Sequence, residues 1–416
     1  MTDKTNPRVE KDAAGLLSSY YILTLYFPAV VLSLGYGIAT PAVPVFAKSF
    51  GTGFGVAALV IIVHSLGSVL STVPTGLLLD RLGRKPILFT GPIFMAVASF
   101  LIAVASSFPE LLLYRFISGW AQEMWKQARI TMIADIGKER QRGRQVTALV
   151  GTEAAGRLLG PAVGGLLAGW SIRAPFVAHG ILGIVAILPS FYLLRDSAPV
   201  ARREVAREAP PQTSNKDAYM AMLRDFKLLG LFVAQLFAAM SRGTLWSGTM
   251  LLYVAFAYNS GPQMLGVLST AAGFVGVPIT LSSGYLMDRF GRKITMVPGF
   301  ILVGGGLTYL AFSAYWHWSL GAFVVAFLWI AVAQSITSGS MQVLGADLAP
   351  RDARGRFFGI WRLVGEIGHI LSPSIFAVLA DHVAFSAAFS FLAVCAFVAA
   401  VLIGLQVRET VGRAKL

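Results

Sequence analysis

The sequence predicts an all-α membrane protein with twelve transmembrane helices in two pseudo-symmetric six-helix bundles. Of its 416 residues, 56% are hydrophobic and 13% are charged, whereas soluble domains are about 25% charged. Apolar runs of about 20 residues, long enough to cross a bilayer as a helix, recur along nearly the whole chain. Basic residues gather in every second connection between these runs, and one connecting motif occurs twice.

The expected spans are the apolar runs between polar connections. They lie at 20–43, 55–79, 86–105, 110–133, 145–170, 175–194, 227–257, 263–287, 294–314, 318–345, 356–380 and 384–406. They form an N-terminal six-helix bundle (1–194) and a C-terminal six-helix bundle (227–416). The segment 195–226 is rich in Arg, Glu, Pro and Asn, and we expect a cytoplasmic linker there.

The distribution of charge predicts the topology. Lys and Arg gather at both termini and in alternate connections, whereas only Lys48 and Arg173 fall in the other set of connections. This is the positive-inside pattern, so both termini are expected in the cytoplasm. A nucleic-acid surface would not alternate with the spans, so the net charge of +14 does not indicate a nucleic-acid partner.

The two halves of the sequence repeat. GLLLDRLGRK (Gly76 to Lys85) returns as GYLMDRFGRK (Gly284 to Lys293), and RGR at 142–144 returns at 354–356. Two copies of one bundle, related by an axis along the membrane normal, are a known transporter architecture. The pattern GxxxxGK[ST] is absent from the sequence, which argues against a P-loop ATPase. A gradient is therefore the expected source of energy.

Three motifs resemble those of one transporter family. The repeated motif resembles the GxLxDRxGRK signature of the major facilitator superfamily, and LLLYRFISGW (111–120) resembles its fourth-helix pattern, with Arg115 at the basic position. GRLLGPAVGG (156–165) resembles the fifth-helix GxxxGPxxGG element of the antiporter branch. The resemblance covers nearly the whole chain and implies the major facilitator fold, alternating access and export. The fifth-helix motif comprises Gly156, Arg157, Gly160, Pro161, Gly164 and Gly165.

The repeated motif also suggests a cytoplasmic latch. Asp80 lies at the end of the second span, where its carboxylate can pair with a basic side chain or a helix N-terminus in one state only. Gly76 is expected to let another helix approach closely. The alternative, plain topogenic charge, is disfavoured by the second copy. The latch residues are Gly76, Asp80, Arg81, Gly83, Arg84 and Lys85, repeated as Gly284, Asp288, Arg289, Gly291 and Arg292.

On the fifth span, Gly156, Gly160 and Gly164 recur every four residues and predict a smooth groove along one face. Pro161 removes a backbone donor and bends the helix. The functional interpretation is a pliant contact between the two halves that seals against leakage. Ordinary small-residue packing is the alternative.

Charged residues inside spans are costly and usually face an aqueous cavity. On the fourth span, Arg115, Lys126 and Arg129 share one face, although snorkelling of the last two to the interface is an alternative. For Arg115 and Glu123 the alternative is a static ion pair. The seventh span carries a similar stripe, in which Trp and Tyr are equally normal in a packed core. The predicted substrate cavity comprises Arg115, Gln122, Glu123, Lys126, Arg242, Trp246 and Tyr253.

A proton-coupling acid must change its proton affinity between states. The candidates are Glu123, Glu153 and Glu366, in that order. Glu123 lies in mid-span beside the basic stripe, whereas Arg157 favours an ionised, structural Glu153. Glu366 has two basic neighbours. The first span has no Asp or Glu, although several drug antiporters place a functional acid there.

These patterns predict a secondary active transporter, a proton-coupled exporter of a small amphipathic solute that resembles the drug/proton antiporters. An organic-anion or lysolipid carrier is the alternative, because basic residues outnumber acids inside the spans. A membrane-embedded enzyme is a remote alternative, since no catalytic constellation is visible. The single cysteine, Cys395, and the scattered histidines indicate no metal or cofactor. The expected partners are the small-molecule substrate, protons and the lipid bilayer, and we expect a monomer in the cytoplasmic (inner) membrane.

Overall fold

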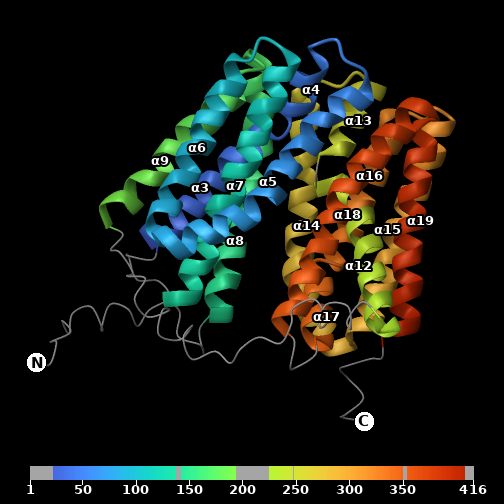
Figure 1. Cartoon of the computed structure of the whole chain (residues 1–416). Coiled ribbons are helices and arrows are strands. Elements are labelled where there is room, and N and C mark those ends of the chain that lie inside the picture. Colours follow the sequence, from blue (N-terminus) through green and yellow to red (C-terminus); the bar gives the residue numbers. More distant parts are fainter. Residues whose placement is uncertain (1–21, 137–141, 194–223, 247, 350–353, 408–416) are drawn as a thin grey trace, which may run out of the picture. The chain divides into compact units, whose positions relative to one another are not determined.

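The computed structural model describes residues 22–136, 142–193, 224–246, 248–349 and 354–407, which are almost entirely helical (Figure 1). Of the described helices, eight are long and apolar enough to cross a membrane. The helices of the fourth and fifth spans, each 29 residues long, are not among these eight. The described apolar parts of the sixth and seventh spans are shorter than the eight. The linker proposed at 195–226 lies almost wholly outside the described residues.

The helices confirm the twelve predicted spans. The first repeat contains a π-helical turn Ile22–Tyr26, α3 (Phe27–Ala39), α4 (Ala42–Lys48), α5 (Phe54–Leu82), α6 (Arg84–Val104), α7 (Phe108–Ile136), α8 (Arg142–Trp170) and α9 (Ala174–Leu193). The second contains α12 (Phe226–Trp246), α13 (Thr249–Ala257), α14 (Pro262–Phe290), α15 (Arg292–Tyr315), α16 (Leu320–Ile336), α17 (Ser340–Leu348), α18 (Arg354–His382) and α19 (Phe385–Gln406).

Three of these spans are interrupted, which the sequence interpretation missed. α12 ends at Trp246, and α13 starts after Gly248, whose φ is 86°. α16 ends at Ile336, and α17 starts after Gly339, whose φ is 73°. The first span is divided between α3 and α4 at Thr40 and Pro41, but here without a left-handed glycine, since Thr40 has a φ of −53°. Glycine adopts this left-handed backbone without the cost that a Cβ imposes, so WSG and TSG interrupt a hydrophobic pattern that otherwise continues.

The chain divides into two compact units. Unit 1 contains Met1–Val43 and Leu66–Glu208, and unit 2 contains Pro44–Ser65 and Ala209–Leu416. α4 and the first part of α5 therefore belong to unit 2 although they lie in the first repeat. Their attachment is polar as well as apolar. Asp381 accepts hydrogen bonds from the Gly55 amide, at 3.0 Å to each carboxylate oxygen, and Lys48 Nζ donates to Ala255 O at 2.6 Å.

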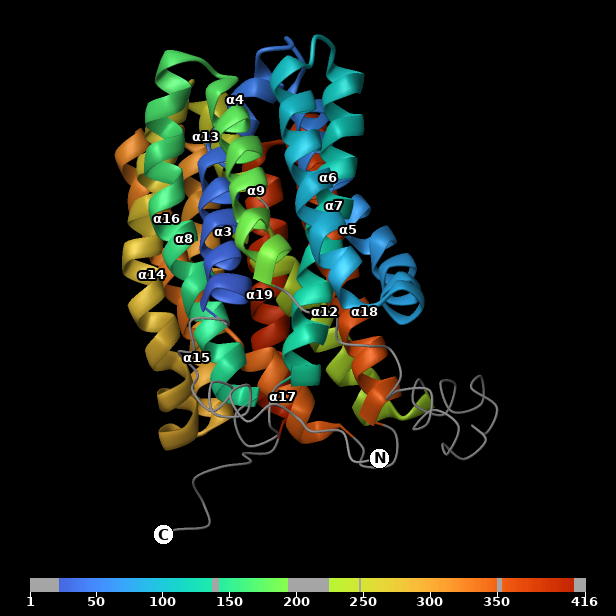
Figure 2. The ribbon, with the colours of Figure 1, turned by 90° about the vertical axis from the view of Figure 1, so that its left-hand side faces the viewer.

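In unit 1, α3 lies between α8 and α9 (Figure 2). The contact with α8 depends on the predicted glycine groove. A Cβ at Gly156 would lie 2.6 Å from Val30 O, and one at Gly160 would lie 2.7 Å from Leu34 O. The groove therefore exists, but its described partner is α3 of the same bundle. The contact between halves that the sequence suggested stays a prediction.

Unit 2 packs in an analogous way. α18 lies along α12, and both contact α19 (Figure 1). Gly368 faces Ala239, where an added Cβ would approach the alanine Cβ to 2.7 Å. Fully buried phenylalanines, including Phe300 and Phe357, fill the interior. Each bundle thus has its own core, which holds the polar side chains of its inner faces in place.

Candidate functional site

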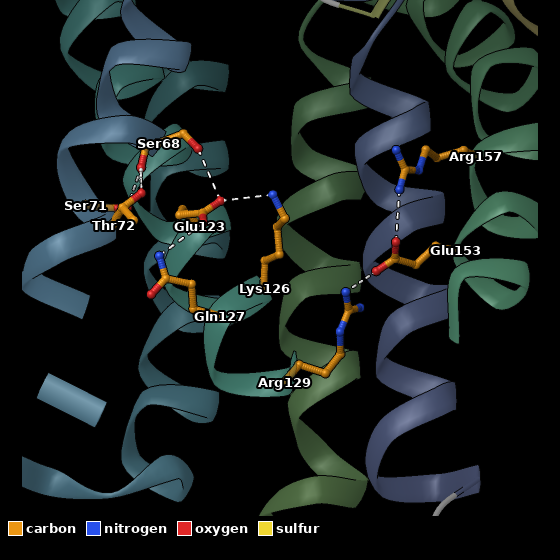
Figure 3. Close-up of polar contacts among 9 residues, drawn as sticks. All are labelled: Ser68, Ser71, Thr72, Glu123, Lys126, Gln127, Arg129, Glu153 and Arg157. Atoms are coloured by element: carbon orange, nitrogen blue, oxygen red, sulfur yellow. Dashed lines mark hydrogen bonds and ion pairs between the residues drawn. The ribbon is translucent and has the colours of Figure 1, made fainter. Parts of the chain in front are cut away.

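The polar groups of unit 1 concentrate on α7 and its neighbours α5 and α8 (Figure 3). Glu123 is only 3% exposed. Its Oε2 accepts from Lys126 Nζ at 3.3 Å and from Ser68 Oγ at 3.4 Å, and its Oε1 accepts from Gln127 Nε2 at 3.1 Å. The buried carboxylate therefore accepts from Lys126, which is charged, and from the neutral side chains of Ser68 and Gln127.

Lys126 differs from its partner in exposure. Its side chain is 46% exposed, whereas that of Glu123 is 4% exposed. A half-exposed lysine on a flexible stem can leave a buried carboxylate without moving a helix. The pair is therefore the most easily separated of the ion pairs in the described part of α7.

Glu153 on α8 has two positively charged partners, whereas Lys126 is the charged partner named for Glu123. It accepts from Arg157 Nη2 at 3.0 Å, which confirms the predicted pair, and it also forms an ion pair with Arg129 of α7. Arg129 is 4% exposed, and its guanidinium stacks on Trp125 with 4.1 Å to the ring centroid. Snorkelling, the alternative for Arg129, is therefore wrong. Glu153 thus connects two guanidinium groups, one from its own helix and one from α7.

Arg115 lies in a second buried cluster of unit 1. It is close enough to His179 of α9 and to Tyr36 of α3 for electrostatic interaction. His179 Nδ1 is 3.0 Å from Ser99 Oγ, and a Cβ at Gly35 would lie 2.7 Å from the imidazole Cδ2. The sequence missed this grouping, because His179 resembles an isolated histidine until α3, α6 and α9 pack together.

In unit 2, Arg242 lies near the end of α12 and donates from Nη1 to Thr337 O at 3.3 Å. The side chain of Trp246 is outside the described residues. Tyr253 is 3% exposed and packs edge-on against Phe385 and Phe389, both at 4.9 Å between centroids. Because α12 ends at Trp246, Arg242 and Tyr253 do not share one continuous helical stripe, and the contacts favour a packing role for Tyr253.

Gln334 on α16 is a polar residue that the sequence interpretation overlooked. It is 2% exposed, and neither side-chain amide atom has a hydrogen-bond partner in the described structure. The register that aligns the two RGR copies also aligns Gln122 with Gln334. Applying the internal repeat to the predicted cavity would therefore have found it.

The latch motifs form the turns before α6 and α15. Gly83 and Gly291 have φ values of 85° and 98°, which explains glycine at both positions. In the second copy, Arg292 forms an ion pair with Asp347 of α17. The Asp80 side chain is exposed, and that of Asp288 is outside the described residues. Among the described residues, a Cβ at Gly76 or Gly284 would meet no atom within 4 Å, so no close helix contact lies at Gly76 in this part of the chain.

The matching family model, described as Major Facilitator Superfamily, covers residues 25–241 and 231–415. The chain belongs to the major facilitator superfamily. It is 27% identical over 365 residues to the quinolone resistance protein NorA of Staphylococcus aureus, covering 86% of this chain and 90% of NorA. It is 26% identical over 343 residues to the multidrug resistance protein MdtG of Enterobacter lignolyticus, covering 80% and 78%.

Solved structures show the same fold. The inward-open xylose transporter XylE of E. coli matches with a TM-score of 0.74 and 16% identity, covering 93% of this chain and 97% of XylE. This confirms the twelve-helix major facilitator fold. The chain is therefore a multi-pass membrane transporter of small molecules, and its relatives by sequence have the names of drug-resistance proteins.

Proposed function

We propose that this transporter is a proton-coupled exporter of small amphipathic solutes that works by alternating access. The export direction is supported by the fifth-helix motif and by the names of NorA and MdtG. The charge asymmetry supports cytoplasmic termini and a position in the inner membrane. A monomer is proposed, since each bundle has a core of its own.

The observation that carries proton coupling is the Glu123–Lys126 pair. While Lys126 lies 3.3 Å from the carboxylate, the buried Glu123 has a positively charged partner. When the half-exposed Lys126 moves away, the carboxylate loses this counter-charge. We propose that Glu123 takes up the coupled proton in that state, because an isolated buried charge is costly.

The other two acids fit this role less well. Glu153 keeps Arg157 and the buried Arg129 as partners, so its protonation would leave two cations without a counter-charge. Glu366 on α18 is partly exposed. In the described structure, its carboxylate has no ion-pair partner whose movement could change its proton affinity. Glu123 therefore remains the first candidate, with Glu153 and Glu366 as the alternatives.

Transport in proteoliposomes with an imposed pH gradient tests the proposal, using cationic, neutral and anionic fluorescent amphiphiles. Glu123→Gln should abolish uphill transport but preserve exchange of substrate for substrate, because exchange needs no net proton movement. Glu110→Gln is the matched control, since Glu110 is on the same helix and its carboxylate accepts hydrogen bonds from Ser106 at the first turn. Uphill transport at the wild-type level in Glu123→Gln would remove that residue from coupling.

A further inference from the structure

Arg242 is a cation with no carboxylate partner in the part of the chain that the structure describes. Among the described residues, its only hydrogen bond goes to the backbone oxygen of Thr337 at 3.3 Å, and its Nε has no partner. The residue keeps part of its surface exposed. A guanidinium inside a membrane domain is costly without a counter-charge, so the retention of this one calls for an explanation.

A purely structural role accounts for only part of this geometry. Thr337 ends α16, and a cation near a helix C-terminus is favourable. However, Ser340 Oγ also donates to Thr337 O, at 2.7 Å, so the carbonyl has a neutral donor without Arg242. A guanidinium has five N–H donors in a fork that matches a carboxylate, and capping one carbonyl uses only one of them.

Two polar side chains without hydrogen-bond partners in the described structure lie next to residues that adjoin or bind Arg242. Ser372 of α18 is fully buried, and a Cβ at the adjacent Gly243 would lie 2.8 Å from its hydroxyl oxygen. Gln334 lies one turn before Thr337 on α16 and is equally unsatisfied. Buried amides and hydroxyls without partners are uncommon in native structures. Both groups can donate to an oxygen ligand.

The helix breaks place two helix N-termini in this region, beside the C-termini of α12 and α16. α13 and α17 are each nine residues long, and both begin after a left-handed glycine without a side-chain cap. The amides of an uncapped helix N-terminus attract anions. Discontinuous transporter helices present such ends to the anionic groups of substrates. Here the breaks occur on the two helices that Arg242 connects.

We propose that Arg242, with Gln334 and Ser372, forms a subsite in unit 2 for a carboxylate or a similar monoanionic group of the transported amphiphile. This rests on the proposed function and narrows its substrate class to amphiphiles with one acidic group. The guanidinium supplies the charge and the fork, and the amide and hydroxyl supply neutral donors. The subsite lies within unit 2 and depends on no residue of unit 1.

Binding of three naphthalene compounds to the purified full-length protein tests this subsite. 2-Naphthoate, 2-naphthamide and 2-naphthylmethylammonium have the same ring but carry negative, zero and positive charge. By calorimetry at neutral pH, the wild type should bind naphthoate at least tenfold more tightly than the amide. Arg242→Gln should remove this preference while changing amide affinity less than twofold. Arg362→Gln, which replaces an exposed cation on α18, should leave the preference intact.

Equal affinities of the wild type for the acid and the amide would overturn the proposal, whether or not Arg242→Gln folds. If Arg242→Gln weakened the binding of all three compounds equally, this would also overturn the proposal, because the arginine would then have a structural role. Gln334→Leu should weaken the binding of naphthoate about threefold and leave the binding of the other two compounds unchanged. Because binding is measured without a gradient, a failure of proton-coupled export would appear separately, as absent pH-driven flux in proteoliposomes.

Discussion

At the scale of single residues, the two ion pairs of the Glu153 carboxylate differ in burial. Arg129 and Arg157 both bind Glu153, but their side chains are 5% and 46% exposed. Removing one partner of a buried pair costs about 3–5 kcal/mol, whereas an exposed helical pair contributes about 0.3–0.5 kcal/mol. Arg129→Gln also loses the stacking on Trp125.

We therefore expect Arg129→Gln to lower the unfolding free energy by about 3 kcal/mol and Arg157→Gln by less than about 1 kcal/mol. Thermal unfolding of the purified variants in detergent measures the difference. Similar midpoints for the two variants would show that the buried pair contributes no more than the exposed one. The i, i+4 spacing revealed Arg157, but nothing in the sequence could reveal Arg129, because that contact needs α7 against α8.

At the scale of helices, the glycines of α8 differ in how closely a neighbouring helix packs against them. A Cβ at Gly160 would lie 2.7 Å from Gly37 Cα and from Leu34 O, both on the α3 backbone. The helices must then move apart. A Cβ at Gly151, on the same helix, meets nothing within 4 Å. Sequence spacing predicted the groove but could not identify its partner.

Gly160→Ala should therefore destabilise the protein by about 1–3 kcal/mol, the usual cost of overpacking. Gly151→Ala should be neutral or stabilising by up to about 1 kcal/mol, since alanine favours a helix over glycine. The change in stability of each variant is measured by thermal unfolding and by the yield of folded protein after extraction. An equally stable Gly160→Ala would mean that α3 and α8 separate without loss.

At the scale of the whole molecule, hydropathy, charge and the internal repeat predicted all twelve spans. They did not predict the breaks in the seventh and tenth spans, because glycine is also common in continuous membrane helices. Nor did they predict that Pro44–Ser65 belongs to unit 2. That assignment depends on contacts distant in sequence, such as Asp381 with the Gly55 amide, which no periodicity encodes.

The latch is the feature that must act on the molecule as a whole. Asp80 is exposed at the end of α5, next to the turn that Gly83 forms, and the proposed latch is a contact that its carboxylate makes in one state of the cycle only. An ion pair within unit 2, Arg292 with Asp347, occupies the second copy of the motif and provides a matched comparison. Neutralising Asp80 should change the balance of states, whereas neutralising Asp347 should first weaken unit 2 itself.

Asp80→Asn is expected to slow transport at least tenfold, while expression and substrate affinity stay within a few-fold of the wild type. The reason is that a state-dependent contact changes the rate of interconversion without touching the substrate. Asp347→Asn should instead lower the thermal midpoint of unfolding. Turnover in proteoliposomes, binding affinity and unfolding are measured on all three proteins. Wild-type turnover in Asp80→Asn would exclude Asp80 from the mechanism, and a lowered midpoint in that variant would assign it a structural role.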